Sequence, residues 1–158
     1  MKEFLKGFVY AGRGLAYCIK NERNFRVHMC FTAYMFGFLC LMDFFEISKA
    51  EFGVLLGLCG LVLALEAVNT ALERAVDLET SEKSELAKVA KDTAAGAVLI
   101  AAIFSVIAGI VIMYQPAAFS EMFAYYNSHP GMLAILVVTI IISVLFVFLP
   151  SAKKEKNK

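Results

Sequence analysis

Four long runs of apolar residues dominate the chain. They cover approximately residues 29–45, 52–71, 93–114 and 132–149. Each run is close to the ~20 residues that an α-helix needs to cross the hydrocarbon core of a bilayer. The first run is the weakest, because Asp43 lies near its end. The pattern predicts an all-α integral membrane protein with four transmembrane helices.

The segment before the first run has the pattern of an amphipathic surface helix over residues 2–20. Its apolar side chains, such as Phe4 and Phe8, can enter the membrane surface, while its basic side chains can reach headgroup phosphates. Residues 21–28 join this helix to the first run. Glu22 and Arg26 stand four residues apart there, so a solvated ion pair between them is the simplest expectation.

Basic residues are distributed unevenly between the apolar runs. The segment before the first run has six Lys and Arg residues, the three connections have one, four and none, and the tail has four. Cytoplasmic segments of membrane proteins are enriched in Lys and Arg. The distribution therefore predicts that both termini and the second connection are cytoplasmic. Residues 115–131, which have no Lys or Arg, are expected to form an external loop.

The remaining composition adds little. Hydrophobic residues make up 60% of the chain, and the net charge of +1 gives no indication of a nucleic-acid partner. The four cysteines have no metal-binding or CxxC spacing, so they are expected to be buried small hydrophobic residues.

Polar residues interrupt the cytoplasmic end of the second run. At 100° per residue, Glu66, Glu73 and Asp77 fall within about 40° of one another, with Asn69 about 60° to one side. Carboxylates in a membrane helix are costly and usually face a bundle interior or water, where they serve a function. The alternative is a structural network that fixes helix register, or ion pairs with Arg74 and Lys91.

Three acids on one stripe favour a bound cation. Mg²⁺ prefers oxygen ligands and usually takes one or two carboxylates together with substrate phosphates. Glu73 and Asp77 lie one helical turn apart, and Glu22 is available from the N-terminal junction. Lys91 could neutralise phosphate charge, and Asp92 could orient a ligand or a basic partner.

Glu66 lies two turns deeper than Glu73. A partly desolvated carboxylate at that depth suits a general base that takes the proton from a lipid hydroxyl. Transfer of a phosphoryl group then needs alignment and charge neutralisation, which these residues can supply. The sequence contains neither a P-loop nor a dinucleotide-binding glycine motif.

The order of these motifs resembles the bacterial diacylglycerol kinase and undecaprenol kinase family. The resemblance rests on the sequence EAVNTALERAVD from Glu66 to Asp77, and on AKVAKD, which ends at Asp92. The upstream segment from Glu22 to His28 resembles the undecaprenol kinase branch of Gram-positive bacteria. The resemblance covers approximately residues 4–114.

Membership of that family would imply a homotrimer with active sites between neighbouring subunits, and the use of ATP and Mg²⁺. Each chain would have a surface helix and three transmembrane helices. By position, Glu66 would be the catalytic base, and Glu22 and Glu73 would hold the metal. Arg13 and Asn69 would be polar residues of the lipid-binding surface and the active site. The implied ATP contacts are Tyr10, Glu22, Glu73, Asp77, Glu82, Lys83, Ser84, Lys91 and Asp92.

The chain is therefore expected to be an ATP-dependent lipid-alcohol kinase of the bacterial cytoplasmic membrane, with undecaprenol as the favoured acceptor. Diacylglycerol is the alternative acceptor, and an ion carrier or a non-catalytic membrane scaffold would be a different class of protein. Residues 1–114 form the expected kinase domain. Residues 115–158, with the helix at 132–149 and a Lys-rich tail, lie outside the usual three-span pattern.

Overall fold

A computed structural model describes residues 2–79 and 84–151 of the chain. These residues form helices and connecting segments, and no strand occurs among them. The all-α prediction is therefore confirmed. The helices are α1 (Lys2–Asn21), α2 (Arg23–Leu41), α3 (Lys49–Glu79), α4 (Glu85–Met113), α5 (Pro116–Ser128) and α6 (Pro130–Val147).

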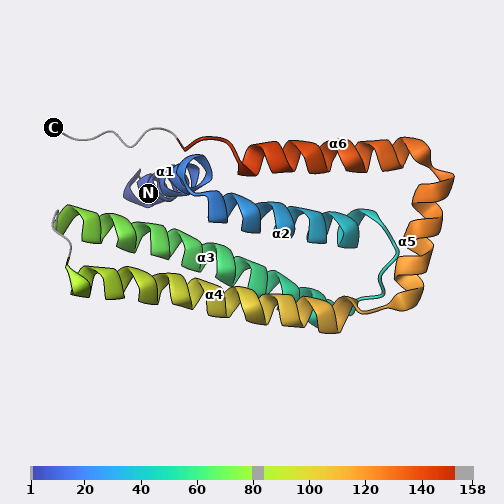
Figure 1. Ribbon diagram of the computed structural model, residues 1–158, viewed down its shortest axis with the longest axis horizontal. Coiled ribbons are helices and arrows are strands. Elements are labelled where there is room, and N and C mark those ends of the chain that lie inside the picture. Colours follow the sequence, from blue (N-terminus) through green and yellow to red (C-terminus); the bar gives the residue numbers. More distant parts are fainter. Residues whose placement is uncertain (1, 80–83, 152–158) are drawn as a thin grey trace.

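Helices α2, α3, α4 and α6 lie along the long axis of the molecule, and α1 and α5 cross its two ends (Figure 1). Helix α3 packs mainly against α4, and α2 packs against both α3 and α6. Helix α1, the last turns of α3, the first turns of α4 and the last turn of α6 share one end of the molecule (Figure 1). The polar stripe of α3, which contains Glu66, Asn69, Glu73 and Asp77, lies at this end.

Three helices are long and apolar enough to cross a membrane. They are α3, α4 and α6, with mean hydropathies of 2.0, 2.7 and 2.7. Helix α2 falls outside this group, because Asn24, Arg26 and His28 lie in its first turns. The sequence predicts the first span at about residues 29–45. The helix that covers this part of the chain, α2, begins at Arg23 and ends at Leu41, before the turn that contains Asp43.

The segment 115–131, expected as an external loop, is mostly helix α5, and its external location stays a prediction. Pro116 occupies the first helical position, where its missing N–H group costs no hydrogen bond. The aromatic side chains of α5 pack on the turn after α2, with ring centroids 5.5 Å apart for Tyr125 and Phe44 and 5.4 Å apart for Phe119 and Phe45. This apolar packing favours a helix over an open loop.

Candidate active site

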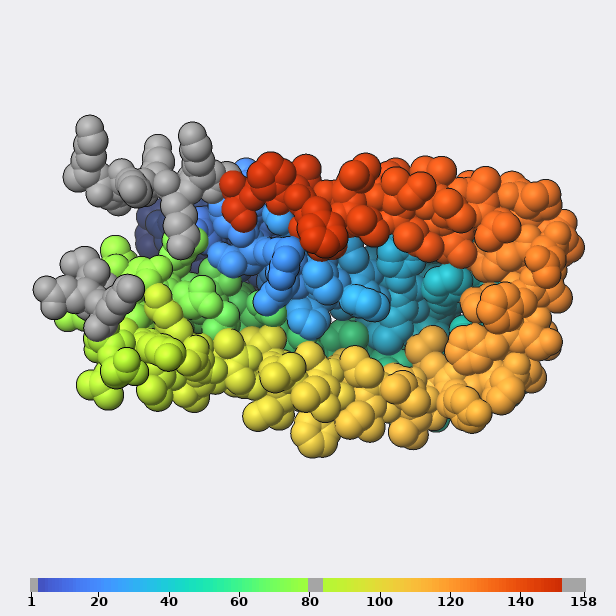
Figure 2. All heavy atoms as spheres, viewed as in Figure 1, coloured from blue at the N-terminus to red at the C-terminus, as the bar shows by residue number. Residues whose placement is uncertain are grey.

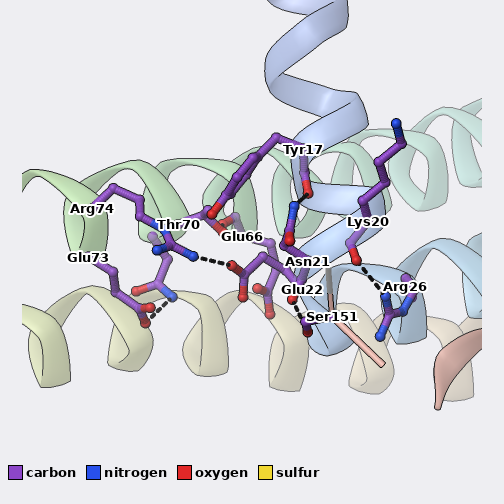
Figure 3. Close-up of polar contacts among 11 residues, drawn as sticks. Tyr17, Lys20, Asn21, Glu22, Arg26, Glu66, Thr70, Glu73, Arg74 and Ser151 are labelled. Atoms are coloured by element: carbon purple, nitrogen blue, oxygen red, sulfur yellow. Dashed lines mark hydrogen bonds and ion pairs between the residues drawn. The ribbon is translucent and has the colours of Figure 1, made fainter. Parts of the chain in front are cut away.

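The polar stripe of α3 faces the junction between α1 and α2 (Figure 3). Glu66 is only 4% exposed, although it carries a carboxylate. Thr70, one turn further along α3, is also buried and donates a hydrogen bond from its hydroxyl to the Glu66 carbonyl at 3.0 Å. The stripe therefore turns its deepest acid into the protein.

The Glu66 carboxylate contacts a histidine from another helix. His28 Nε2, in the second turn of α2, lies 3.5 Å from Glu66 Oε1. The carboxylates of Glu22 and Glu73 are close enough to act electrostatically on Glu66. The neighbours of the Glu66 carboxylate are therefore two other acids, Glu22 and Glu73, and the imidazole ring of His28.

Glu22 is the single residue between α1 and α2. Its backbone is extended, with φ −108° and ψ 111°, and its side chain makes no capping bond at the start of α2. Its Oε1 atom lies 3.7 Å from Arg74 Nη2 on α3, and the Arg74 guanidinium lies 5.2 Å from the Tyr17 ring centroid (Figure 3). The expected pair between Glu22 and Arg26 is wrong, because the buried Arg26 side chain bonds to backbone carbonyls instead.

Asn69 connects the stripe to Glu73. Its Nδ2 atom donates to Glu73 Oε1 at 3.1 Å. Its Oδ1 atom is buried and has no hydrogen-bond partner among the described residues. An unpaired buried oxygen is costly, so this atom indicates a place for a donor or a cation.

The donor set fits Mg²⁺ with few protein ligands. Within the described part of the chain, no group of three or more His, Cys, Asp or Glu side chains lies close enough to hold a metal ion. Mg²⁺ usually needs only one or two carboxylates, because phosphate and water oxygens complete its shell. Glu22, at the α1–α2 junction, and Glu73, on α3, would supply the carboxylates, and Asn69 Oδ1 is an additional oxygen.

The other predicted residues are spread along the same end of the molecule. Lys91 Nζ on α4 lies 2.5 Å from Asp77 Oδ1 on α3. This is the ion pair with Lys91 that the sequence left open as an alternative to a catalytic role. Ser84 is the N-cap of α4 and accepts a hydrogen bond from the Ala87 N–H at 3.5 Å. Asp92 is exposed on α4.

Tyr10 and Arg13 lie on the exposed α1, with the Arg13 guanidinium 5.9 Å from the Tyr10 ring centroid. Glu82 and Lys83 lie outside the described residues.

Several neighbours of the site were not expected from the sequence. Cys18 is buried, as expected, whereas Cys40 is exposed and Cys30 and Cys59 are half-buried. Cys18 lies beside Thr70 and the carboxylates of Glu22 and Glu66. Burial raises the pKa of the Cys18 thiol, so it stays protonated beside these acids. Tyr17 and Arg26 also help to build the junction. The residue types of Cys18, Tyr17 and Arg26 did not indicate these roles, because each role depends on a contact with a distant segment of the chain.

Comparisons with known proteins identify the family of the chain. The family model described as prokaryotic diacylglycerol kinase matches residues 9–113. The chain belongs to this family. The family match ends at Met113, the last residue of α4, so α5 and α6 lie outside it.

Relatives in the family carry two kinds of name. The undecaprenol kinase of Bacillus subtilis (strain 168) is 41% identical over 114 residues, which are 71% of this chain and 89% of the relative. A diacylglycerol kinase of Synechocystis is 42% identical over 113 residues, 71% of this chain and 63% of the relative. The diacylglycerol kinase of Escherichia coli (strain K12) is 32% identical over 111 residues, 70% of this chain and 88% of the relative. No solved structure matches the chain significantly.

The family and the three apolar helices make the protein a membrane-embedded bacterial lipid kinase.

Proposed function

We propose that the chain transfers the γ-phosphoryl group of ATP to the hydroxyl of undecaprenol at the cytoplasmic face of the membrane. The observation that carries this proposal is the buried Glu66 carboxylate, which contacts His28, a residue that lines an apolar cavity. The Bacillus subtilis relative named undecaprenol kinase supports this choice of acceptor.

The apolar cavity supports a lipid acceptor. It has a volume of about 420 Å³ and is lined by residues of α2, α3 and α4, including His28, Phe31, Val62 and Val106. Its surface is almost entirely apolar, which suits part of an isoprenoid or acyl chain. Because His28 lines the cavity and also contacts Glu66, a lipid chain in this cavity would place its hydroxyl end near the His28–Glu66 pair.

Glu66 would act as the general base. It would accept the proton of the lipid hydroxyl while the hydroxyl oxygen forms a bond to the γ-phosphorus. The bond from the γ-phosphorus to the bridging oxygen breaks in the same step, and ADP leaves. Burial fixes the carboxylate in place, so little reorganisation is needed when the substrate arrives.

Glu22 and Glu73 would hold Mg²⁺, with Asn69 beside them as an additional polar group. When bound, Mg²⁺ neutralises charge on the ATP phosphates. Arg74 adds a positive charge next to Glu22. The proposed ATP contacts are Tyr10, Glu22, Glu73, Asp77, Glu82, Lys83, Ser84, Lys91 and Asp92, and Arg13 would face the lipid headgroup region.

The proposed assembly is a homotrimer with active sites between neighbouring subunits. Residues 1–114 would form the kinase domain, and residues 115–158 an appended segment. The Lys and Arg pattern supports cytoplasmic termini and a cytoplasmic active site.

The test is phosphate transfer from labelled ATP by the purified full-length protein in mixed micelles with Mg²⁺. Undecaprenol and diacylglycerol are offered separately, and Glu66→Gln serves as the inactive control. We expect transfer to undecaprenol, and a loss of turnover in Glu66→Gln with nucleotide binding largely retained. Equal loss of nucleotide binding would contradict the role of Glu66 as base.

Diacylglycerol is the second candidate acceptor, because the Synechocystis and Escherichia coli relatives are named diacylglycerol kinases. Transfer mainly to diacylglycerol would keep the mechanism and overturn the choice of undecaprenol. No transfer to either lipid by a folded preparation would overturn the proposed function.

A further inference from the structure

One buried side chain ties the C-terminal helix α6 to the start of α2. Arg26 is 2% exposed. Its Nε and Nη2 atoms donate to the Val147 carbonyl at 3.2 and 3.0 Å, and Nη2 also donates to the Leu149 carbonyl at 2.8 Å. Its Nη1 atom donates to the carbonyls of Ile19 and Lys20 at 3.3 and 3.2 Å. These contacts use all five N–H groups of the guanidinium.

The acceptors belong to the ends of two helices. Ile19 and Lys20 lie in the last turn of α1, Val147 is the last residue of α6, and Leu149 follows it. Carbonyls at a helix C-terminus lack partners within the helix, and the helix dipole favours a cation there. Arg26 therefore gains hydrogen bonds and a favourable field without a carboxylate partner.

A second contact joins the same segments. Ser151 Oγ, after α6, donates to the Asn21 carbonyl at 2.7 Å (Figure 3). The carbonyls of Ile19, Lys20 and Asn21 are thus bound in succession by Arg26 and Ser151. The next residue along the chain is Glu22, whose own carbonyl accepts the Arg26 backbone N–H at 3.3 Å.

The part of α1 before Tyr17 gives this junction little support. Every residue from Glu3 to Tyr17 is exposed, and burial in α1 begins at Cys18. In the space-filling view, the red end of α6 lies directly against the blue residues of the first two helices (Figure 2). The direction of the Glu22 side chain therefore depends on contacts at the C-terminal end of α1, and α6 supplies several of them.

We propose that α6 is a positioning element of the active site. Through Arg26 and Ser151 it fixes the α1–α2 junction, so that the Glu22 carboxylate points toward the polar stripe of α3 and can hold Mg²⁺. This inference rests on the proposed function. It goes beyond the family resemblance, because α6 and Ser151 lie outside the matched residues 9–113.

The test compares full-length variants by their dependence on Mg²⁺. Arg26→Gln removes the charge and most donors, Arg26→Lys keeps the charge with fewer donors, and Ser151→Ala removes only the contact to Asn21. Ser143→Ala is the matched control, because its hydroxyl lies 3.2 Å from the Tyr34 hydroxyl, further along the same pair of helices. Apparent KM for Mg²⁺, KM for the lipid and kcat are measured for each.

We expect Arg26→Gln to raise the apparent KM for Mg²⁺ by about tenfold, the usual effect of losing a group that orients a metal ligand. Ser151→Ala should shift it less in the same direction, and Arg26→Lys should recover part of the loss. KM for the lipid should change little, and Ser143→Ala should behave as the unmodified chain. Unchanged Mg²⁺ dependence in folded Arg26→Lys and Ser151→Ala would overturn the proposal, even where Arg26→Gln does not fold.

Amide hydrogen exchange separates this inference from the proposed function. Ser151→Ala and Arg26→Lys should speed exchange over residues 18–26, whereas Ser143→Ala should not. Faster exchange in a chain that phosphorylates no lipid would support the contact between α6 and the junction but overturn its proposed role toward Mg²⁺. Exchange that is unchanged in both variants would overturn the structural basis of the inference.

Discussion

At the scale of single residues, the contact between His28 and Glu66 is the feature that connects the polar stripe to the apolar cavity. A buried carboxylate with two acidic neighbours needs a partner that keeps it in place. His28 provides that partner from α2, and it also lines the apolar cavity. We interpret His28 as a positioning residue that aligns Glu66 with the end of the lipid chain.

Replacing His28 with alanine should lower kcat by about tenfold or more, because the misplacement of a general base affects the chemical step. KM for ATP should change little, since His28 is not among the proposed ATP contacts. Steady-state kinetics with each substrate varied in turn would measure this split. His129→Ala is the control, because His129 is the only other histidine and lies at the far end of the molecule. An equal effect of both substitutions, or an effect on KM for ATP alone, would contradict this role.

The sequence predicts the polar stripe well, because Glu66, Asn69 and Glu73 share one helix and helical spacing alone places them together. It does not predict the partners of the stripe. His28 reaches Glu66 from another helix, and Arg26 bonds to carbonyls 121 and 123 residues away. Every residue has a backbone carbonyl, so no pattern of residue types could indicate which carbonyls Arg26 would contact.

At the scale of helices, the α3–α4 pair shows which polar contacts matter for stability. The pair packs along its length, and the ion pair of Asp77 and Lys91 is an addition at its end. Their side chains are 44% and 35% exposed, so the ion pair contributes about 1 kcal/mol or less to folding. If Lys91 served only to pair with Asp77, its loss would therefore have a small effect on both stability and activity.

The proposed kinase role predicts a different outcome for Lys91→Met. Its midpoint of thermal unfolding in detergent should stay close to that of the unmodified chain, while KM for ATP should rise about tenfold, because a charged hydrogen bond to phosphate is lost. Lys88→Met is the matched control, since Lys88 is exposed one turn earlier on α4. The proposal for Lys91 fails if Lys91→Met and Lys88→Met have the same KM for ATP.

At the scale of the whole molecule, the number of passes determines where the termini lie. Three apolar helices alone would place the two termini on opposite sides of the membrane. Helix α2 lies between α3 and α6 (Figure 1), and we propose that it is a fourth pass, although its first turns are polar. The Lys and Arg distribution agrees with four passes, because its three basic segments would share one side.

Single cysteines in intact cells would test this topology, after the four native cysteines have been replaced by serine. Glu121→Cys, on the exposed side of α5, should react with a membrane-impermeant maleimide added from outside. Lys158→Cys and Lys6→Cys should react only after the membrane is permeabilised. Labelling of Lys158→Cys but not Lys6→Cys in intact cells would mean three passes. The α2 helix would then lie on the membrane surface, and Glu22 and His28 could not approach α3 as the mechanism requires.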